Sequence, residues 1–231
     1  MTAPQELMIA GAGGLGRETA AAVRAANAAT ATPPFHLLGF LDDDPALAGV
    51  AVDGVAVLGP VDREQLAARP DAQVVVCTGS ATDRFSRRRI VARLGIPAEQ
   101  YATVVHPSAV LGDGCTLGPG CVVLSAAVAT MAVELGAHVV VMPTTVFTHD
   151  DAVGSFVTFG AGAKLAGRVT VGDGAYLGAG VLVREGCSVG AWSVVGMGAV
   201  VLDDVPPAEA WVGNPAHRLR VELPTDDDAM A

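Results

Sequence analysis

The chain has 231 residues, of which 51% are apolar but only 4% are aromatic, and it contains 28 glycines. The high apolar content excludes a disordered chain, and the scarcity of aromatic rings is untypical of a β-sandwich or a globin-like bundle. With 14 Lys and Arg residues against 24 Asp and Glu residues, the net charge of -10 disfavours nucleic-acid binding, which requires a basic face.

The sequence predicts a cytoplasmic protein without metal. Its first residues lack the basic region of a signal peptide, and polar residues interrupt every apolar run before it reaches the length of a membrane span. The four cysteines form no Cys-x-x-Cys pair, so neither a zinc site nor a redox pair is expected. They are Cys77, Cys115, Cys121 and Cys187.

Residues 1–102 alternate between strand and helix patterns. Short apolar runs at residues 7–10, 35–41 and 74–76 predict strands. Residues 17–29 and the segment around residues 85–94 have apolar positions at helical spacing. This alternation predicts a small parallel α/β sheet, and therefore a Rossmann-like N-terminal domain.

The ends of these predicted strands carry residues that suit a nucleotide. The first strand is followed by Gly11-x-Gly13-x-x-Gly16, whose N–H groups at a helix start could hold a diphosphate. Asp42 and Asp43 end the second strand, and parallel strands bring such ends to one crevice. The alternative is that the glycines only provide a tight strand–helix turn.

A basic cluster follows the third strand. Its spacing suits one exposed helix face, and we expect a solvated surface rather than a binding patch. The cluster consists of Arg84, Arg87, Arg88, Arg89 and Arg93.

From Val105 to Val201, every sixth residue is apolar without a slip in register. The residue four positions later is usually small, as at Cys115, Ala163 and Ala199. This period is typical of a parallel β-helix built from hexapeptide repeats, in which three short strands form one triangular coil. We therefore assign residues 103–205 to a left-handed β-helix and residues 206–231 to a C-terminal segment with an acidic tail. The cysteines at the small positions are expected to be structural.

One histidine stands out within the repeats. His149 is followed by Asp150, and a carboxylate can hold an outward-facing imidazole in one tautomer and make it more basic. A solvated surface histidine is the alternative. His138 is expected on the surface of a coil.

Taken together, these motifs resemble those of the bacterial sugar acetyltransferases of the sialic acid O-acetyltransferase type, which include N-acetyltransferases of nucleotide-linked amino sugars. The resemblance spans about residues 6–220. It rests on Ile9–Gly16, Gly39–Asp43, Val105–Ala109, His149-Asp150 with Val153-Gly154, and Val212–Ala216.

The resemblance implies a homotrimer with active sites between neighbouring β-helices, with His149 as the general base and Asp150 as the acid that tunes it. It further implies two groups of binding residues. The nucleotide-sugar group is Gly13, Gly14, Asp42, Asp43 and Gly79, and the acetyl-CoA group is Thr158, Gly167 and Arg218. Leu15, Met142 and Thr158 occupy positions where family members often carry His, Asn and a second His.

The sequence therefore predicts an acetyl-CoA-dependent N-acetyltransferase of a nucleotide-linked amino sugar, with a 4-amino-4,6-dideoxy sugar as the favoured acceptor. Two enzymatic alternatives are O-acetylation of a sugar hydroxyl and transfer of another acyl group. A non-enzymatic alternative is a β-helix scaffold that binds nucleotide sugars. Neither nucleic acid nor membrane insertion is expected.

Overall fold

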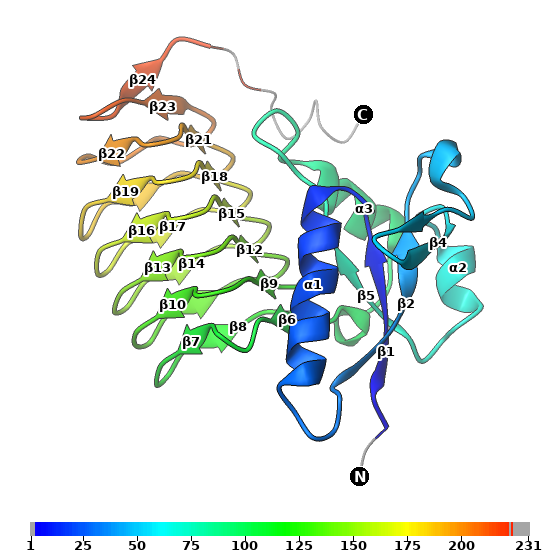
Figure 1. The fold of residues 1–231 in the computed structure, drawn as a ribbon. Helices are drawn as coiled ribbons and strands as arrows, with labels where there is room; N and C mark the ends of the chain where they lie inside the picture. Colours follow the sequence, from blue (N-terminus) through cyan, green and yellow to red (C-terminus); the bar gives the residue numbers. More distant parts are fainter. Residues whose placement is uncertain (1–2, 222, 224–231) are drawn as a thin grey trace.

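The computed structural model describes residues 3–221 and residue 223. The chain forms an N-terminal α/β domain that packs against one side of a β-helix (Figure 1). The predicted acidic tail at residues 225–228 lies outside the described residues. No helix among the described residues is long and apolar enough to cross a membrane.

The N-terminal domain contains a five-stranded sheet in the order β3-β4-β2-β1-β5. β1 pairs in parallel with β2 and β5, as the alternating strand and helix patterns predicted. The strands are β1 (Gln5–Ala10), β2 (Phe35–Leu41), β3 (Ala51–Val52), β4 (Val55–Gly59) and β5 (Gln73–Val76). The helices are α1 (Gly14–Ala28), α2 (Arg63–Ala67) and α3 (Ser86–Leu94), with 3-10 turns at Pro45–Leu47 and Ala98–Gln100.

Helix α1 lies between this sheet and the β-helix. Its sequence is rich in alanine, which favours helix and lets the backbone approach its neighbours closely. One cluster of buried side chains joins Ile9 of β1, Ala20 and Val23 of α1, and Val122 and Val140 of the β-helix. The two halves of the chain therefore share a core, which fixes the N-terminal domain against the coils.

The β-helix has three parallel sheets of two-residue strands. Strands eighteen residues apart pair with each other, for example at Val141↔Phe159 and Phe147↔Leu165. The strands are β6 (Val104–Val105), β7 (Val110–Leu111), β8 (Thr116–Leu117), β9 (Val122–Val123), β10 (Val128–Ala129), β11 (Glu134–Leu135), β12 (Val140–Val141), β13 (Val146–Phe147), β14 (Ala152–Val153), β15 (Thr158–Phe159), β16 (Lys164–Leu165), β17 (Thr170–Val171), β18 (Tyr176–Leu177), β19 (Leu182–Val183), β20 (Ser188–Val189), β21 (Val194–Val195) and β22 (Val200–Val201).

We name the three sheets by the side of the prism that they form. Sheet I contains β6, β9, β12, β15, β18 and β21 and faces the N-terminal domain. Sheet II contains β7, β10, β13, β16, β19 and β22, and sheet III contains β8, β11, β14, β17 and β20. At the C-terminal end, β23 (Ala210–Val212) and β24 (His217–Leu219) continue sheet I.

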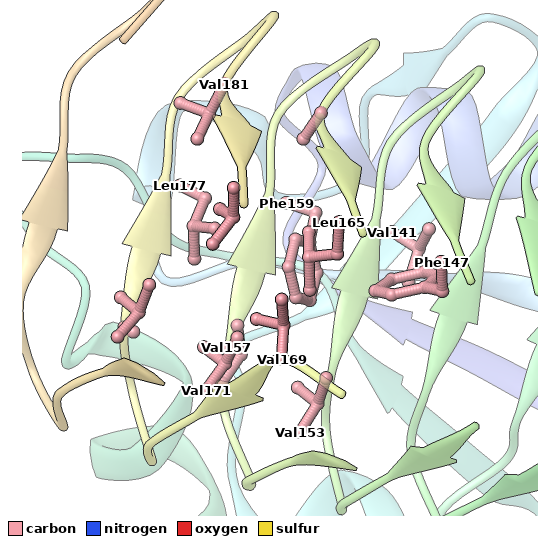
Figure 2. Packing of buried hydrophobic residues seen from close by; sticks show 14 of the residues in the cluster. Val141, Phe147, Val153, Val157, Phe159, Leu165, Val169, Val171, Leu177 and Val181 are labelled. Atoms are coloured by element: carbon pink, nitrogen blue, oxygen red, sulfur yellow. The ribbon is translucent and has the colours of Figure 1, made fainter. Parts of the chain in front are cut away.

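The six-residue register is confirmed, because its residues are the second residues of the strands and point into the prism (Figure 2). Phe147 and Phe159 meet edge to face inside, with ring centroids 4.8 Å apart. Leu111 is the exception, since it is 40% exposed in the first coil of sheet II, where no earlier coil covers it. The architecture fits a left-handed β-helix of the hexapeptide-repeat type.

The prediction of a solvent-exposed arginine face was wrong for Arg84 and Arg87, which are 3% and 1% exposed. The Arg84 Nε donates to the Trp192 carbonyl at 2.9 Å, and Phe85 stacks on the Trp192 ring with centroids 4.3 Å apart. The start of α3 therefore packs on the β-helix. Helical spacing within residues 84–93 gave no sign of this contact, because the partner surface comes from about a hundred residues later in the chain.

Arg87 crosses the boundary between the two halves. Its guanidinium donates to the carbonyls of Thr78 (2.8 Å), His138 (3.2 Å) and Phe156 (2.6 Å) and to Thr158 Oγ1 (2.7 Å). All of these acceptors are neutral oxygens. Burial lowers the pKa of Arg87 to about 10, so the side chain remains charged at neutral pH.

His138 is also buried, which corrects the expectation of a surface position. It is 4% exposed and its ring lies between Tyr101 and Phe156, with centroid distances of 4.6 and 5.1 Å. Burial lowers the pKa of His138 to about 4, with a further contribution from the charge of Arg87. The neutral ring therefore acts as a packing element at the boundary between the two halves.

Candidate active site

The His149–Asp150 pair lies on the turn between β13 and β14, at the corner between sheets II and III. His149 Nδ1 and Asp150 Oδ2 are 2.8 Å apart, and the two side chains are 51% and 57% exposed. With the carboxylate as acceptor, the Nδ1–H is the donor, and the lone pair of Nε2 remains available. The pair is thus arranged as an oriented base on the surface of a rigid coil.

Gly167, one coil further along, lies against the His149 ring. A Cβ at Gly167 would lie 2.4 Å from His149 Nε2 and 2.5 Å from Cε1. The next residue, Arg168, donates its N–H to the His149 carbonyl at 2.9 Å. Glycine at this position therefore gives the imidazole ring its space, a geometric reason for Gly167 that the sequence did not reveal.

Asp151 is a buried carboxylate directly beneath this pair, which we did not select from the sequence. It is 0% exposed, and it accepts the Thr148 N–H at 3.0 Å and the Val169 N–H at 2.9 Å. Burial raises the pKa of Asp151 to about 6. A signal was present in the sequence, because Asp151 occupies a repeat position that elsewhere holds small or apolar residues.

The glycines of the glycine-rich loop fall into two groups with different surroundings. Gly11 has φ +106°, and a Cβ there would lie 2.7 Å from the Cys77 carbonyl oxygen, while a Cβ at Gly16 would overlap the Gly11 carbonyl. These two glycines are required by the turn itself. Gly13 and Gly14 have no atoms near their would-be Cβ positions, so they border open space at the start of α1.

The two predicted carboxylates are already hydrogen-bonded within the domain. Asp42 Oδ2 accepts the Ala12 N–H at 2.7 Å, which ties the second strand to the glycine-rich loop. Asp43 accepts the Val61 N–H at 2.9 Å and pairs with Arg93 at 2.6 Å. Both side chains therefore already have partners within the domain.

A cavity of about 340 Å³ lies where the N-terminal domain meets sheet I and the corner between sheets I and II. Its polar side chains are Arg87, Thr158 and Tyr176, and its other walls are apolar or glycine. Leu15, Met142 and Thr158, the three positions that differ from the family pattern, all line this cavity. The full lining is Leu15, Gly79, Arg87, Val140, Met142, Thr158, Gly160, Ala161, Tyr176, Ala179 and Met197.

The structure does not bring all predicted site residues together within one chain. Gly79 and Thr158 share the cavity beside sheet I, whereas His149 and Gly167 share the corner between sheets II and III. Arg218 lies in β24 at the C-terminal end of the prism, where its Nε is 3.2 Å from Glu209. Among the described residues, no group of three His, Cys, Asp or Glu side chains could hold a metal ion.

No protein-family model matches the sequence, and a sequence search finds no matching curated protein. Solved structures match over nearly the whole chain. A variant of perosamine N-acetyltransferase from Caulobacter crescentus, in complex with CoA and GDP-perosamine, has a TM-score of 0.82 at 26% identity, covering 94% of this chain and 97% of that one.

Two further structures also match over nearly the whole chain. The acetyltransferase domain of PglB from Neisseria gonorrhoeae, in complex with acetyl coenzyme A, has a TM-score of 0.79 at 28% identity, covering 94% of this chain and 100% of that one. WeeI from Acinetobacter baumannii has a TM-score of 0.70 at 25% identity, covering 93% and 100%. The resemblance to hexapeptide-repeat sugar acetyltransferases is therefore confirmed at the level of structure.

Proposed function

We propose that this chain is an acetyl-CoA-dependent N-acetyltransferase that acts on a nucleotide-linked amino sugar, with a 4-amino-4,6-dideoxy sugar as the favoured acceptor. The observation that carries the proposal is the oriented His149–Asp150 pair on a chain that matches sugar N-acetyltransferases over 94% of its length. A neighbour bound to GDP-perosamine favours N-acetylation over the O-acetyl alternative.

The chemistry follows from the free Nε2 of His149. The amine of the sugar attacks the thioester carbonyl of acetyl-CoA, and Nε2 accepts the proton that the nitrogen loses. Asp150 then stabilises the imidazolium through the Nδ1–H bond of 2.8 Å. The carbon–sulfur bond breaks as the tetrahedral intermediate collapses, and the proton passes to the departing thiolate. The products are the sugar acetamide and CoA.

A donor for the developing oxyanion is needed near His149. The Gly167 backbone is the nearest candidate, since its Cα lies against the imidazole ring. Its N–H has no acceptor among the hydrogen bonds of the described residues. We therefore assign Gly167 to the acetyl-CoA side of the site, with Thr158 and Arg218 as further contacts along the same substrate.

The nucleotide is assigned to the N-terminal domain, which we infer to be Rossmann-like, within residues 1–102. Gly13 and Gly14 border open space at the helix start, where N–H groups and the helix dipole favour phosphate. Asp42, Asp43 and Gly79 complete the crevice. Gly79 also borders the cavity next to the β-helix, so a sugar extending from this crevice would enter that cavity.

A homotrimer would bring together the His149 corner and the cavity beside sheet I, which lie apart within one chain. The outward residues of sheet II are mostly Val and Leu, whereas those of sheet III are mostly polar or small. Sheet II presents Val110, Val128, Val146, Lys164, Leu182 and Val200, and sheet III presents Thr116, Glu134, Ala152, Thr170 and Ser188. We infer that the apolar sheet is buried against other copies.

The position of sheet II explains why three copies would complete the site. His149 lies at one edge of this sheet, and the cavity lies at the other edge. If the sheet II faces surround a three-fold axis, the His149 corner of each copy faces the cavity corner of its neighbour. Each active site would then combine the base from one chain with the nucleotide-sugar crevice of another.

Release of free thiol from acetyl-CoA tests the proposal, with UDP-, dTDP- and GDP-linked 4-amino sugars as acceptors. Acceptor-dependent release that His149→Ala slows by about 10²–10⁴-fold is expected. Release with nucleotide sugars that lack an amino group would indicate O-acetylation, and release only with a longer acyl-CoA would indicate another acyl group. Binding of a nucleotide sugar without release from any acyl-CoA would indicate the scaffold.

A further inference from the structure

The hydrogen-bond ladder of the β-helix is interrupted beside His149. At the other corners, the first residue after a strand donates its N–H to a carbonyl of the following coil, as from Met142 to Phe159 (3.0 Å) and from Gly154 to Val171 (2.8 Å). The Thr148 N–H instead donates to Asp151 Oδ2 at 3.0 Å. The ladder is therefore diverted at the residue that precedes His149.

The same carboxylate reaches the following coil. Asp151 Oδ1 accepts the Val169 N–H at 2.9 Å, so the two oxygens connect the His149 turn with the turn that contains Gly167. The Thr148 hydroxyl is buried here and has no hydrogen-bond partner among the described residues. Such an arrangement is local to this corner, because it depends on the only carboxylate at an interior repeat position.

The fold itself does not require a carboxylate at this point. The equivalent positions of other coils hold Ala163, Ala175, Ser193 and Ala199, all of them buried. Burying a charge in this interior is unfavourable, and the pKa of Asp151 is accordingly raised to about 6. Since a small side chain could replace Asp151 without loss of the coil, stability does not account for a carboxylate at this position.

We propose that Asp151 is a positioning residue for His149: by diverting the N–H groups of Thr148 and Val169, it sets the turn in which the imidazole meets both Asp150 and Gly167. It touches neither substrate. This inference rests on the proposed function, because the effect is expressed through the base. A small residue at position 151 would return the Thr148 N–H to the regular ladder and shift the turn.

The test uses Asp151→Ala, which places the residue of other coils at this corner, together with Asp151→Asn, which keeps the shape. We expect Asp151→Ala to fold as stably as the wild type or more so, while kcat falls about tenfold or more. The KM for acetyl-CoA should change less than about twofold, and Asp151→Asn should lie between Asp151→Ala and the wild type. Ser193→Ala, at the same repeat position in another corner, is the matched control and should retain full turnover.

Combination with His149→Ala shows whether Asp151 acts through the base. Adding Asp151→Ala to His149→Ala should not lower the residual turnover further. An equal tenfold fall in that background, a kcat unchanged by Asp151→Ala alone, or a variant that fails to fold would overturn the inference. If His149→Ala alone keeps full turnover, the assignment of the base in the proposed function is what fails.

Discussion

Arg87 Nη2 lies 2.7 Å from Thr158 Oγ1, and this hydrogen bond joins the N-terminal domain to sheet I of the β-helix across 71 positions of sequence. Both residues line the cavity to which we assign the sugar. Because the hydroxyl oxygen of Thr158 accepts from the guanidinium, its own proton is free to be donated to another acceptor. The hydrogen bond thus contributes to the packing of the two halves and also orients two of the polar side chains that line the cavity.

Replacing Arg87 by Met should loosen the N-terminal domain from the β-helix. The carbonyls of Thr78, His138 and Phe156 would lose their donor in a buried place, at a cost of about 3 kcal/mol or more. Thermal unfolding and limited proteolysis measure the effect. Arg89→Met is the control, since the exposed Arg89 forms a surface ion pair with Asp83 at 2.7 Å. An Arg87→Met chain as stable as this control would contradict the account.

Asp150→Asn should lower kcat only modestly. The amide oxygen can still accept the Nδ1–H of His149, but the charge that stabilises the imidazolium is lost. Because the Asp150 side chain is 57% exposed, solvent screens this charge and we expect a loss of about fivefold. Steady-state kinetics at saturating acetyl-CoA check the value. A loss as large as that of His149→Ala would show that Asp150 itself carries the proton transfer.

Gly167→Ala should displace the imidazole ring without disturbing the backbone. Its Cβ would lie 2.4 Å from Nε2, so the ring must move by about 1 Å to reach ordinary contact, and a misplacement of this size costs about a hundredfold in rate. The predicted signature is a fall in kcat, with no additional fall when the change is combined with His149→Ala. A raised KM for acetyl-CoA at an unchanged kcat would assign Gly167 to substrate contact alone.

The assembly can be tested on the faces of the prism. Val146→Lys places a charge on sheet II and should give monomers and lose activity, because each site then lacks the partner's corner. Thr170→Lys adds the same charge to sheet III and should leave the assembly intact. Sedimentation measures the mass of each variant. An active monomer would contradict a site shared between chains.

The sequence was most informative where the structure repeats. A six-residue period recurs in every strand of the β-helix, so Val105 to Val201 predicted its coils and its core from local pattern alone. His149 and Asp150 are neighbours in sequence, and their 2.8 Å contact needed no knowledge of the fold.

Features that depend on distant parts of the chain were not readable in this way. Arg84 and Arg87 were expected in solvent because helical spacing says nothing about a surface supplied by Trp192 and Phe156. The cavity that Gly79 and Thr158 share could not be predicted either, because its walls come from distant parts of the chain. Asp151 breaks the residue pattern of its repeat position, but the groups that its carboxylate contacts appear only in the ladder between two coils.

The central claim is amide formation at the expense of acetyl-CoA, with His149 as the base. The most direct measurement is carbon NMR of the product formed from carbonyl-labelled acetyl-CoA and a nucleotide-linked 4-amino-4,6-dideoxy sugar. The account predicts an acetamide carbonyl signal, formed about 10²–10⁴-fold more slowly by His149→Ala. An ester signal, or an acetamide formed at the same rate by His149→Ala, would contradict it.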